Sequence, residues 1–448
     1  MARNALRHIP ARACNNGGWL PLPKRDKHTL SRNAVLLIAL GLMGFAFAMR
    51  APAGAPTQPA PAAVAPVSIP EPTPLAVRYY QSGNALFVAS TLWGFAVPAL
   101  IFFSGLSARL RDVSRRARRH WYLELMIYFV LFALIYFAAN VPLDYYSDFS
   151  RPHEFGLSSQ TFGKWLNDEL LNLGLDLIGG ALVLWIPFLL LKRAAERWWL
   201  YTWFAGVPIL FCLAFIQPIW IEPLFNHFGP MQDQVLLSRI VDLAHRAGID
   251  GAHVFQVNKS VDTDELNAYV AGIGSTKRIV VWDTTLKAFT PDETTVTMAH
   301  EMGHYALGHV WKGLLFLSMA LLAGLWLIHL CVGRILRRFS LRTGVKEPGD
   351  IAALPLLILL FSVFAFLLTP PLLAVSRHFE HEADRFALDL THDNHTCAMV
   401  FVKFIRHDLA YPTPSRLIQI LRASHPSAGE RISFCNRYHP WLEGREGK

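Results

Sequence analysis

Residues 300–304 read His-Glu-Met-Gly-His, a spacing that can hold a metal ion for hydrolysis. Side chains four apart on a helix lie on one face, so His300 and His304 can bind one ion through imidazole nitrogens. Glu301 is rotated by about 100° and can reach a water on the ion, but not the ion itself. The motif therefore predicts a zinc site that still needs one protein ligand and keeps an open water position. Two surface histidines on an ordinary helix are the alternative interpretation.

The third ligand must come from elsewhere, and residues 376–384 (SRHFEHEAD) offer carboxylates at helical spacing. Glu380 and Asp384 are four apart. If one of them binds zinc, the other lies one turn along, where it can accept the free N–H of a ligating histidine. A solvated helix face is the alternative for this pair. Glu382 points elsewhere on the helix and is the weaker candidate, and His309 falls off the ligand face as a solvated residue or one behind a ligand.

The sequence around the motif predicts a small α/β unit. Residues 290–293 (TPDE) form a capping box with proline at the first helical position, so the helix that carries the motif begins there. Residues 233–247 have apolar side chains at helical spacing and are followed by Gly248. Residues 253–257 and 278–283 are short and rich in Val and Ile, which is typical of strands.

The remainder of the chain is strongly apolar. Hydrophobic residues make up 53% and charged residues 17%, against about 25% charged in an ordinary soluble domain, and the mean hydropathy is +0.30. This composition excludes a disordered chain, a disulfide-stapled secreted module and most soluble enzymes. A membrane crossing needs about 20 apolar residues. The runs that meet this length are about 85–106, 121–143, 171–191, 198–221, 311–332 and 351–375.

A further run, residues 34–49, is marginal because its length also fits the core of a signal peptide; an uncleaved anchor is favoured. Residues 51–75 are rich in proline and alanine, a composition that prefers an extended linker. The predicted segments are a basic leader (1–33), an anchor or signal segment (34–49), a Pro/Ala-rich linker (50–83), four spans (85–221), a catalytic part with the HExxH (222–310), two spans (311–375) and a C-terminal catalytic part (376–448).

Basic residues predict the orientation, because short loops rich in Arg and Lys stay on the cytoplasmic side. Such clusters follow the first, third and fifth of the six long runs, at Arg109, Arg111, Arg115, Arg116, Arg118 and Arg119, at Lys192, Arg193 and Arg197, and at Arg334, Arg337, Arg338 and Arg342. The opposite loop, 144–170, is acidic or balanced. Both long polar stretches are therefore predicted outside the cytoplasm, on the periplasmic side of a bacterial inner membrane. A miscounted run would invert this orientation.

The net charge of +9 does not indicate a nucleic-acid partner, since the arginines follow the ends of the spans and no aromatic-basic interleaving occurs. The five cysteines are dispersed without a CxxC pair, so they predict neither a disulfide framework nor a cysteine metal site. Cys397 and Cys435 share the oxidising side if the orientation holds, and whether they pair stays open.

Four motifs occur in a distinctive order: ELNAY ahead of RIVVWDTTL, the HExxH, SRHFEHEAD, and SHP followed by Glu-Arg. In this order they resemble the membrane zinc metallopeptidases typified by the type I CAAX prenyl protease, from about residue 75 to the end. The resemblance implies a ring of helices around a large hydrated chamber. It implies that His300, His304 and Glu380 bind zinc, that Glu301 is the base, and that Asp384 lies behind a ligand histidine. It also implies that His425 and Arg431 lie near the oxyanion, and that the Asn267–Ala268 strand edge holds a peptide by backbone pairing.

These observations predict a mainly α fold, a polytopic membrane bundle of about seven spans around a chamber with a small α/β zinc-peptidase domain. The predicted function is a zinc metalloendopeptidase, with one Zn²⁺ per chain, that cleaves membrane-associated or extracytoplasmic polypeptides. The eukaryotic relatives place the zinc domain in the cytosol, so the orientation predicted here argues against a CAAX protein as natural substrate. The alternative is a non-proteolytic transporter or lipid-binding protein with a structural metal site. The sequence leaves open whether the role is processing or quality control.

Overall fold

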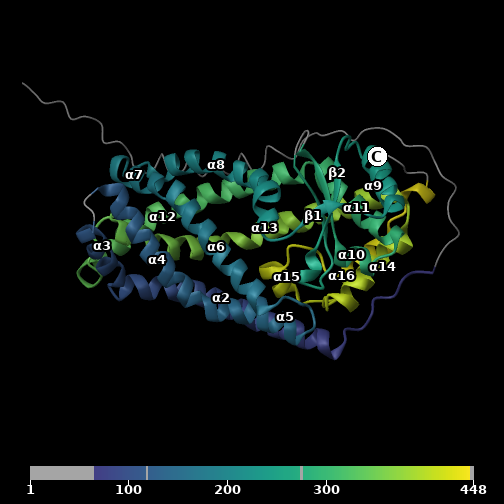
Figure 1. Cartoon of the computed structure of the whole chain (residues 1–448), viewed down its shortest axis with the longest axis horizontal. Coiled ribbons are helices and arrows are strands. Elements are labelled where there is room, and N and C mark those ends of the chain that lie inside the picture. Colours follow the sequence, from purple (N-terminus) through teal and green to yellow (C-terminus); the bar gives the residue numbers. More distant parts are fainter. Residues whose placement is uncertain (1–64, 118–119, 273–275, 444–448) are drawn as a thin grey trace, which may run out of the picture. The chain divides into compact units, whose positions relative to one another are not determined.

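The structure is a computed structural model of the chain, and it describes residues 65–117, 120–272 and 276–443. The predicted leader (1–33) and the anchor or signal segment (34–49) lie outside the described residues. All described residues belong to one compact unit. Helices dominate this unit, and one small sheet accompanies them (Figure 1).

Six helical segments of the described chain are long and apolar enough to cross a membrane, which confirms the six long runs predicted from the sequence. They are α2 (Pro74–Phe103), α4 (Trp121–Asp144), α6 with α7 (Phe162–Val183 and Trp185–Arg193), α8 (Trp198–Ile216), α12 (His309–Thr343) and α13 (Leu354–Thr391). At 1.5 Å per residue the 38 residues of α13 extend for about 57 Å, against about 30 Å of hydrocarbon. One end of α13 therefore projects well beyond the lipid.

The linker predicted for residues 50–83 ends earlier than expected, because α2 begins at Pro74. Thr73 caps the helix by accepting a hydrogen bond from the backbone N–H of Ala76 at 3.1 Å. Ala76 is fully buried against a small cluster that includes Phe155 and Leu409. The first turns of α2 thus belong to the packed fold, and the Thr-Pro pair is a helix start within a proline-rich stretch.

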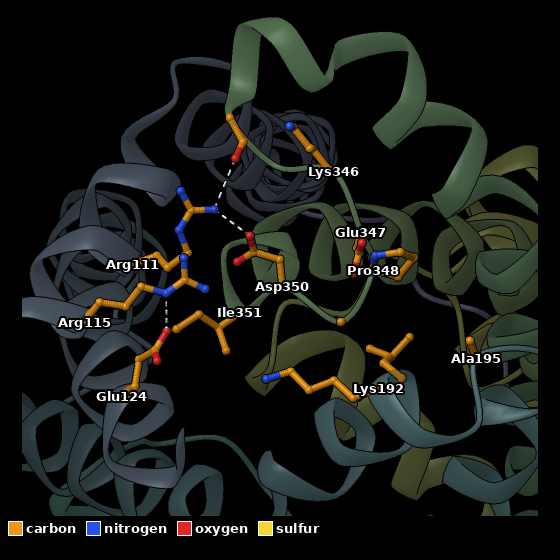
Figure 2. A pocket seen from close by; sticks show the side chains of 13 residues that line it. Arg111, Arg115, Glu124, Lys192, Ala195, Lys346, Glu347, Pro348, Asp350 and Ile351 are labelled. Atoms are coloured by element: carbon orange, nitrogen blue, oxygen red, sulfur yellow. Dashed lines mark hydrogen bonds and ion pairs between the residues drawn. The ribbon is translucent and has the colours of Figure 1, made fainter. Parts of the chain in front are cut away.

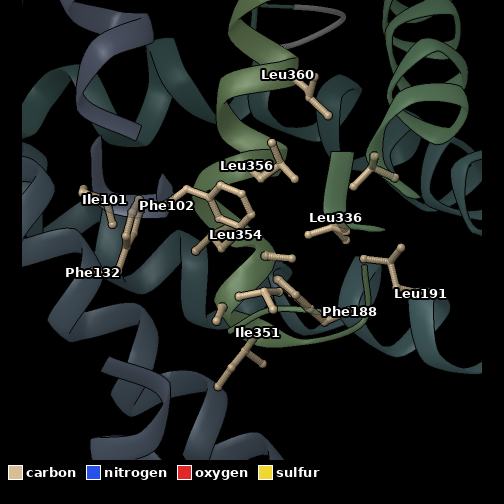
Figure 3. Packing of buried hydrophobic residues seen from close by; sticks show 14 of the residues in the cluster. Ile101, Phe102, Phe132, Phe188, Leu191, Leu336, Ile351, Leu354, Leu356 and Leu360 are labelled. Atoms are coloured by element: carbon tan, nitrogen blue, oxygen red, sulfur yellow. The ribbon is translucent and has the colours of Figure 1, made fainter. Parts of the chain in front are cut away.

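The membrane helices share a large apolar core. Phe102 of α2, Phe188 of α7, Leu336 of α12 and Leu356 of α13 are buried together in it (Figure 3). Because lipid tails are as apolar as these side chains, the helices are held together by close van der Waals packing rather than by the exclusion of water. This core holds together helices that are far apart in the sequence.

One cavity brings together the three basic connections used to predict the orientation. It measures about 650 Å³ and is lined by residues of α3 (Leu106–Ala117), of the end of α7 and of the α12–α13 connection (Figure 2). An ion pair of 2.5 Å joins Arg111 to Asp350, and another of 2.7 Å joins Arg115 to Glu124. Because all three connections line one cavity, they lie at the same end of the membrane helices.

The sheet has four strands in the order β1-β2-β4-β3, namely β1 (Phe228–Pro230), β2 (His253–Val257), β4 (Arg278–Trp282) and β3 (Ala268–Ala271). β2 and β4 run parallel, whereas the two outer pairs are antiparallel. The two strands and the helix predicted from the sequence are confirmed as β2, β4 and α9 (Gln234–Arg246). A core that includes Ile240, Ile279, Met298 and Met302 packs α9 and α11 (Pro291–Ala306) on the sheet.

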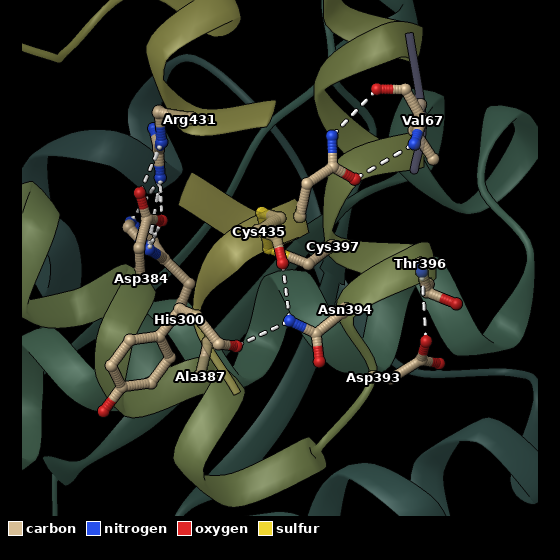
Figure 4. The surroundings of a disulfide bond; sticks show 12 residues. Val67, His300, Asp384, Ala387, Asp393, Asn394, Thr396, Cys397, Arg431 and Cys435 are labelled. Atoms are coloured by element: carbon tan, nitrogen blue, oxygen red, sulfur yellow. Dashed lines mark hydrogen bonds and ion pairs between the residues drawn. A yellow bond between two sulfur atoms is a disulfide. The ribbon is translucent and has the colours of Figure 1, made fainter. Parts of the chain in front are cut away.

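The other helices are α5 (Arg151–Glu154), α10 (Asp283–Ala288), α14 (Asn394–His407), α15 (Arg416–Arg422) and α16 (Ala428–Arg437). α14 packs on α16, and a disulfide between Cys397 and Cys435 joins the two helices (Figure 4). Leu388 of α13 and Val296 of α11 belong to the same core. The two polar stretches on either side of the α12–α13 hairpin thus form one structure, a mainly α fold with a small mixed sheet, as predicted.

Candidate metal centre

Helix α11 positions the HExxH residues. It begins with the predicted capping box, in which Thr290 and Glu293 cap each other's backbone N–H groups at 2.7 and 3.2 Å. Its last turns pack directly on α13, and Gly303 makes the close approach feasible: a Cβ there would lie 3.1 Å from the Cβ of Phe386. This contact fixes how the histidines of α11 face the carboxylates of α13.

Three potential metal ligands meet between these two helices. The Nε2 atoms of His300 and His304 lie 3.1 Å apart, and the carboxylate oxygens of Glu380 lie 3.3 and 3.4 Å from them. Within the described residues, their ligand atoms form a group that could hold a metal ion, with all atoms inside 4.8 Å of one another. Glu380 is only 6% exposed, and its Oε2 has no hydrogen-bond partner in the described chain. A buried carboxylate that faces two imidazoles, one at each oxygen, and whose Oε2 has no hydrogen bond fits a divalent cation.

Glu301 is half-buried beside this group on α11. Burial raises the pKa of its carboxyl, although the charges of His300 and His304 act in the opposite direction. A carboxylate in such a place can hold and release a proton more readily than an exposed glutamate.

Asp384 lies one turn beyond Glu380 and reaches His300, with 2.9 Å between its Oδ1 and the Nδ1 of the imidazole. Arg431 of α16 binds both carboxylate oxygens of Asp384 (Figure 4). Its Nε lies 2.9 Å from Oδ2, and its Nη2 lies 2.5 Å from Oδ1. The guanidinium stacks on Phe401 at 4.2 Å and lies 3.4 Å from Glu380. Arg431 therefore contacts the carboxylates of the site and is itself buried behind them.

His309 and Glu382 form a second link behind His304, which is one of the two positions that the sequence left open for His309. The Nδ1 atoms of His309 and His304 are 2.9 Å apart, and Nε2 of His309 is 3.1 Å from the Glu382 carboxylate. His309 is 4% exposed and stacks on Phe379 at 4.4 Å. Gly308 explains the placement: its left-handed backbone, with φ of 68°, ends α11 and starts α12 in a new direction. That glycine is the signal that could have revealed the break.

His425 also reaches the cluster, with its Nε2 3.2 Å from Oε1 of Glu380, and its side chain is 58% exposed. The turn before it is tied to α13, because Arg377 donates hydrogen bonds to the backbone oxygens of Gln419 and Ala423 at 2.9 and 2.7 Å. An accessible imidazole next to the three potential metal ligands can contact a bound substrate.

The Asn267–Ala268 segment enters β3, which is an edge strand of the sheet. Ala268 pairs with Val281 of β4, and the backbone N–H of Asn267 donates to Oγ1 of Thr285 at 2.8 Å. Residues of β3 also contact α11. The other edge of β3 pairs with no strand in the described part of the chain, and there the N–H of Ala268 donates to Oδ1 of Asn267 at 2.8 Å.

A His-His-Glu group between a membrane-spanning helix and an HExxH helix defines a membrane metallopeptidase. The family model described as peptidase family M48 matches residues 230–438, and the model of the five-helix N-terminal membrane part of CAAX prenyl proteases matches residues 55–227. The chain belongs to the membrane metallopeptidases of peptidase family M48, the family of the CAAX prenyl proteases.

Relatives cover most of the chain. The Bacillus subtilis protein named uncharacterized metalloprotease YhfN is 35% identical over 374 residues, which is 83% of this chain and 88% of that one. CAAX prenyl protease 1 of Saccharomyces cerevisiae is 29% identical over 314 residues, 66% of this chain and 68% of that one. The crystal structure of S. mikatae Ste24p superimposes with a TM-score of 0.72 at 20% identity, covering 81% and 88% of the two chains, and supports the same fold.

Proposed function

We propose that this protein is a membrane-embedded zinc metalloendopeptidase in which His300, His304 and Glu380 hold the metal. The observation that carries the proposal is the buried Glu380 carboxylate, which faces two imidazole Nε2 atoms and keeps one oxygen without a hydrogen bond in the described chain. Zinc bound there supplies a Lewis acid for the scissile carbonyl and an acidified water at neutral pH. The other steps belong to residues of the chain.

Glu301 acts as general base and then as general acid. It takes the proton of the attacking water and passes it to the leaving amine. Its raised pKa suits the second step, since the carboxyl must carry that proton until the peptide bond breaks. Asp384 contacts Nδ1 of His300 and is itself bound by Arg431, so these two residues fix the orientation of the imidazole toward the metal.

His425 is the donor to the developing oxyanion, because its imidazole is accessible and lies beside Glu380. The family resemblance implied the same task for Arg431, but this residue is better suited to positioning, since Asp384 already occupies two of its nitrogens. The edge of β3 at Asn267 and Ala268 pairs with the substrate backbone and holds it extended, once the N–H of Ala268 has left Oδ1 of Asn267. A hydrated chamber among the helices stays a prediction.

The catalytic part is proposed to face the periplasm of a bacterial inner membrane. Two observations support this side: the three basic connections line one cavity, as retained cytoplasmic loops would, and a disulfide joins α14 to α16. The substrates are then membrane-associated or extracytoplasmic polypeptides, although some relatives are named CAAX prenyl proteases. A transporter or lipid-binding protein with a structural metal is not favoured, because the chain belongs to a peptidase family.

The Glu301→Gln variant tests this function. Its hydrolysis of an internally quenched peptide should fall to background, while zinc content stays near one ion per chain. Peptidase activity retained in this variant would refute the assigned base. A topology reporter fused after residue 448 tests the side, and a cytoplasmic signal would bring prenylated proteins back as substrates.

A further inference from the structure

The cavity among the basic connections lies at the opposite end of the membrane helices from the metal centre. Helix α12 separates the two places, because it begins at His309 beside the metal centre and ends at Thr343, just before the connection that lines the cavity. Its 35 residues extend for about 50 Å at 1.5 Å per residue. The cavity is therefore too distant to take part in hydrolysis. Its volume of about 650 Å³ is within the range of about 300–1,000 Å³ that is usual for small-molecule sites.

The bases of this cavity are only partly neutralised. Its charged lining residues are Arg111, Arg115, Lys192, Lys346, Glu124, Glu347 and Asp350 (Figure 2). Asp350 and Glu124 pair with the two arginines, as described above. Neither lysine has a carboxylate oxygen within 4.0 Å in the described chain, and the exposed Glu347 has no basic partner there. Two lysines thus share the cavity with one unpaired carboxylate.

Several N–H groups around the cavity also have no acceptor. Arg111 donates from Nε and Nη1 and Arg115 from Nε, so Nη2 of Arg111 and both terminal nitrogens of Arg115 donate to no atom of the described chain. Nζ of Lys192 lies over the ring of Trp121, 5.0 Å from its centre. Nε1 of that tryptophan is buried and has no hydrogen-bond partner among the described residues. An anion with several acceptor oxygens would satisfy such donors.

The cavity lies where the membrane helices end. Lys192 directly follows the apolar residues 185–191 of the third span, and Trp121 begins the second span. Lysine at the end of a span and tryptophan beside it mark the level of the lipid headgroups. Phosphate is the anion of that level, and basic cavities between membrane helices bind anionic headgroups there. Both lysines are exposed, so a headgroup can reach them.

We propose that this cavity binds the phosphate of an anionic phospholipid, with Lys192 and Lys346 as its counter-ions. The unused guanidinium N–H groups of Arg111 and Arg115 are further donors to the phosphate oxygens. Because the lining comes from α3, α7 and the α12–α13 connection, one bound headgroup links three segments that are far apart in the sequence. The site is separate from the proposed peptidase activity.

Native mass spectrometry of the full chain, released from a neutral detergent, tests this site. The protein is incubated with equal amounts of phosphatidylglycerol and phosphatidylcholine that carry the same acyl chains. The wild type should retain one phosphatidylglycerol in preference to phosphatidylcholine. Lys192→Gln and Lys346→Gln should each weaken this binding about fivefold, and the double variant about 25-fold, since one basic residue at an anionic membrane surface contributes about that much.

Arg193→Gln is the matched control. This exposed arginine adjoins Lys192 but does not line the cavity, so its loss should leave the retained lipid unchanged. Equal retention of the two lipids by the wild type would overturn the proposal. Undiminished retention of phosphatidylglycerol by the double variant, or an equal loss in Arg193→Gln, would overturn it as well. A melting curve in phosphatidylcholine alone checks that each variant is folded.

Inorganic phosphate distinguishes a lipid headgroup from a soluble anion. Phosphatidylglycerol that stays bound in millimolar phosphate supports the lipid as the source of the phosphate group. Displacement of the lipid under these conditions would mean that the cavity takes a soluble phosphate, and it would overturn the phospholipid. The readout is the mass of bound lipid, so failure of the peptidase function would leave this result standing.

Discussion

Replacing His309 by phenylalanine tests whether the buried imidazole behind His304 stabilises the metal centre. Phenylalanine keeps the ring that stacks on Phe379 at 4.4 Å, and it removes the contacts of 2.9 Å with His304 and 3.1 Å with Glu382. When Nε2 of His304 binds the metal, its Nδ1 carries the proton and donates to His309, which donates in turn to Glu382. The substitution leaves that Nδ1–H without an acceptor.

The expected magnitude follows from this arrangement. An unsatisfied buried donor costs about 1–3 kcal/mol. Partners behind metal ligands are typically worth about 10- to 100-fold in metal affinity, or about 1.4–2.7 kcal/mol, so the two figures agree. We expect His309→Phe to raise the Kd for zinc about 10- to 100-fold and to recover most of its activity at saturating zinc.

A chelator competition titration measures the zinc Kd, and a melting curve checks that each variant is folded. His309→Gln should bind zinc nearly as well as the wild type, because a glutamine can accept from His304 and donate to Glu382. His378→Phe is the matched control: this histidine also approaches Glu382, at 3.7 Å, but its side chain is 69% exposed. Wild-type zinc affinity in His309→Phe would refute the reasoning.

Three further predictions concern the fold that supports the site. Changing Cys397 and Cys435 to serine removes a disulfide that closes a loop of 38 residues, which should lower the free energy of unfolding by about 4 kcal/mol. Melting curves should show a lower Tm, and an unchanged Tm would contradict a formed disulfide. Gly303→Ala should destabilise the protein by about 1–3 kcal/mol and lower its activity, because the new Cβ meets Phe386 at 3.1 Å; a neutral result would mean that α11 and α13 can separate freely. Burial raises the pKa of Asp408 from 3.8 to about 6, so its protonated form adds stability that is complete below pH 3.8 and lost as the pH rises through about 6. Melting curves between pH 4 and 8 should show this loss, and Asp408→Asn should remove it; an identical pH profile in the variant would count against a buried Asp408.

The features that could be predicted from the sequence depend on local signals. Runs of apolar residues identified the six spans, because only long helices can cross the lipid with every backbone group paired. The capping box at Thr290 marked the start of α11 to the residue. Strands β2 and β4 were readable because both are short runs of branched apolar residues.

The contacts of the site depend on how distant segments pack, and the sequence left them open. A solvated face remained an alternative for Glu380 and Asp384, and the close packing of α11 on α13 at Gly303 is what buries both carboxylates. The spacing of one continuous helix puts His309 off the ligand face, so the sequence left open a solvated position or one behind a ligand. The break at Gly308 invalidates that spacing, so His309 turns back to His304.

The proposed metal ligands lie on both sides of the α12–α13 hairpin: His304 precedes it and Glu380 follows it on the projecting end of α13. A newly synthesised chain therefore cannot complete the centre until this hairpin has been inserted into the bilayer. A water-soluble fragment that lacks the hairpin would have no covalent connection to bring Glu380 to the histidines. Insertion of the hairpin into the membrane is thus the step that brings the proposed metal ligands together.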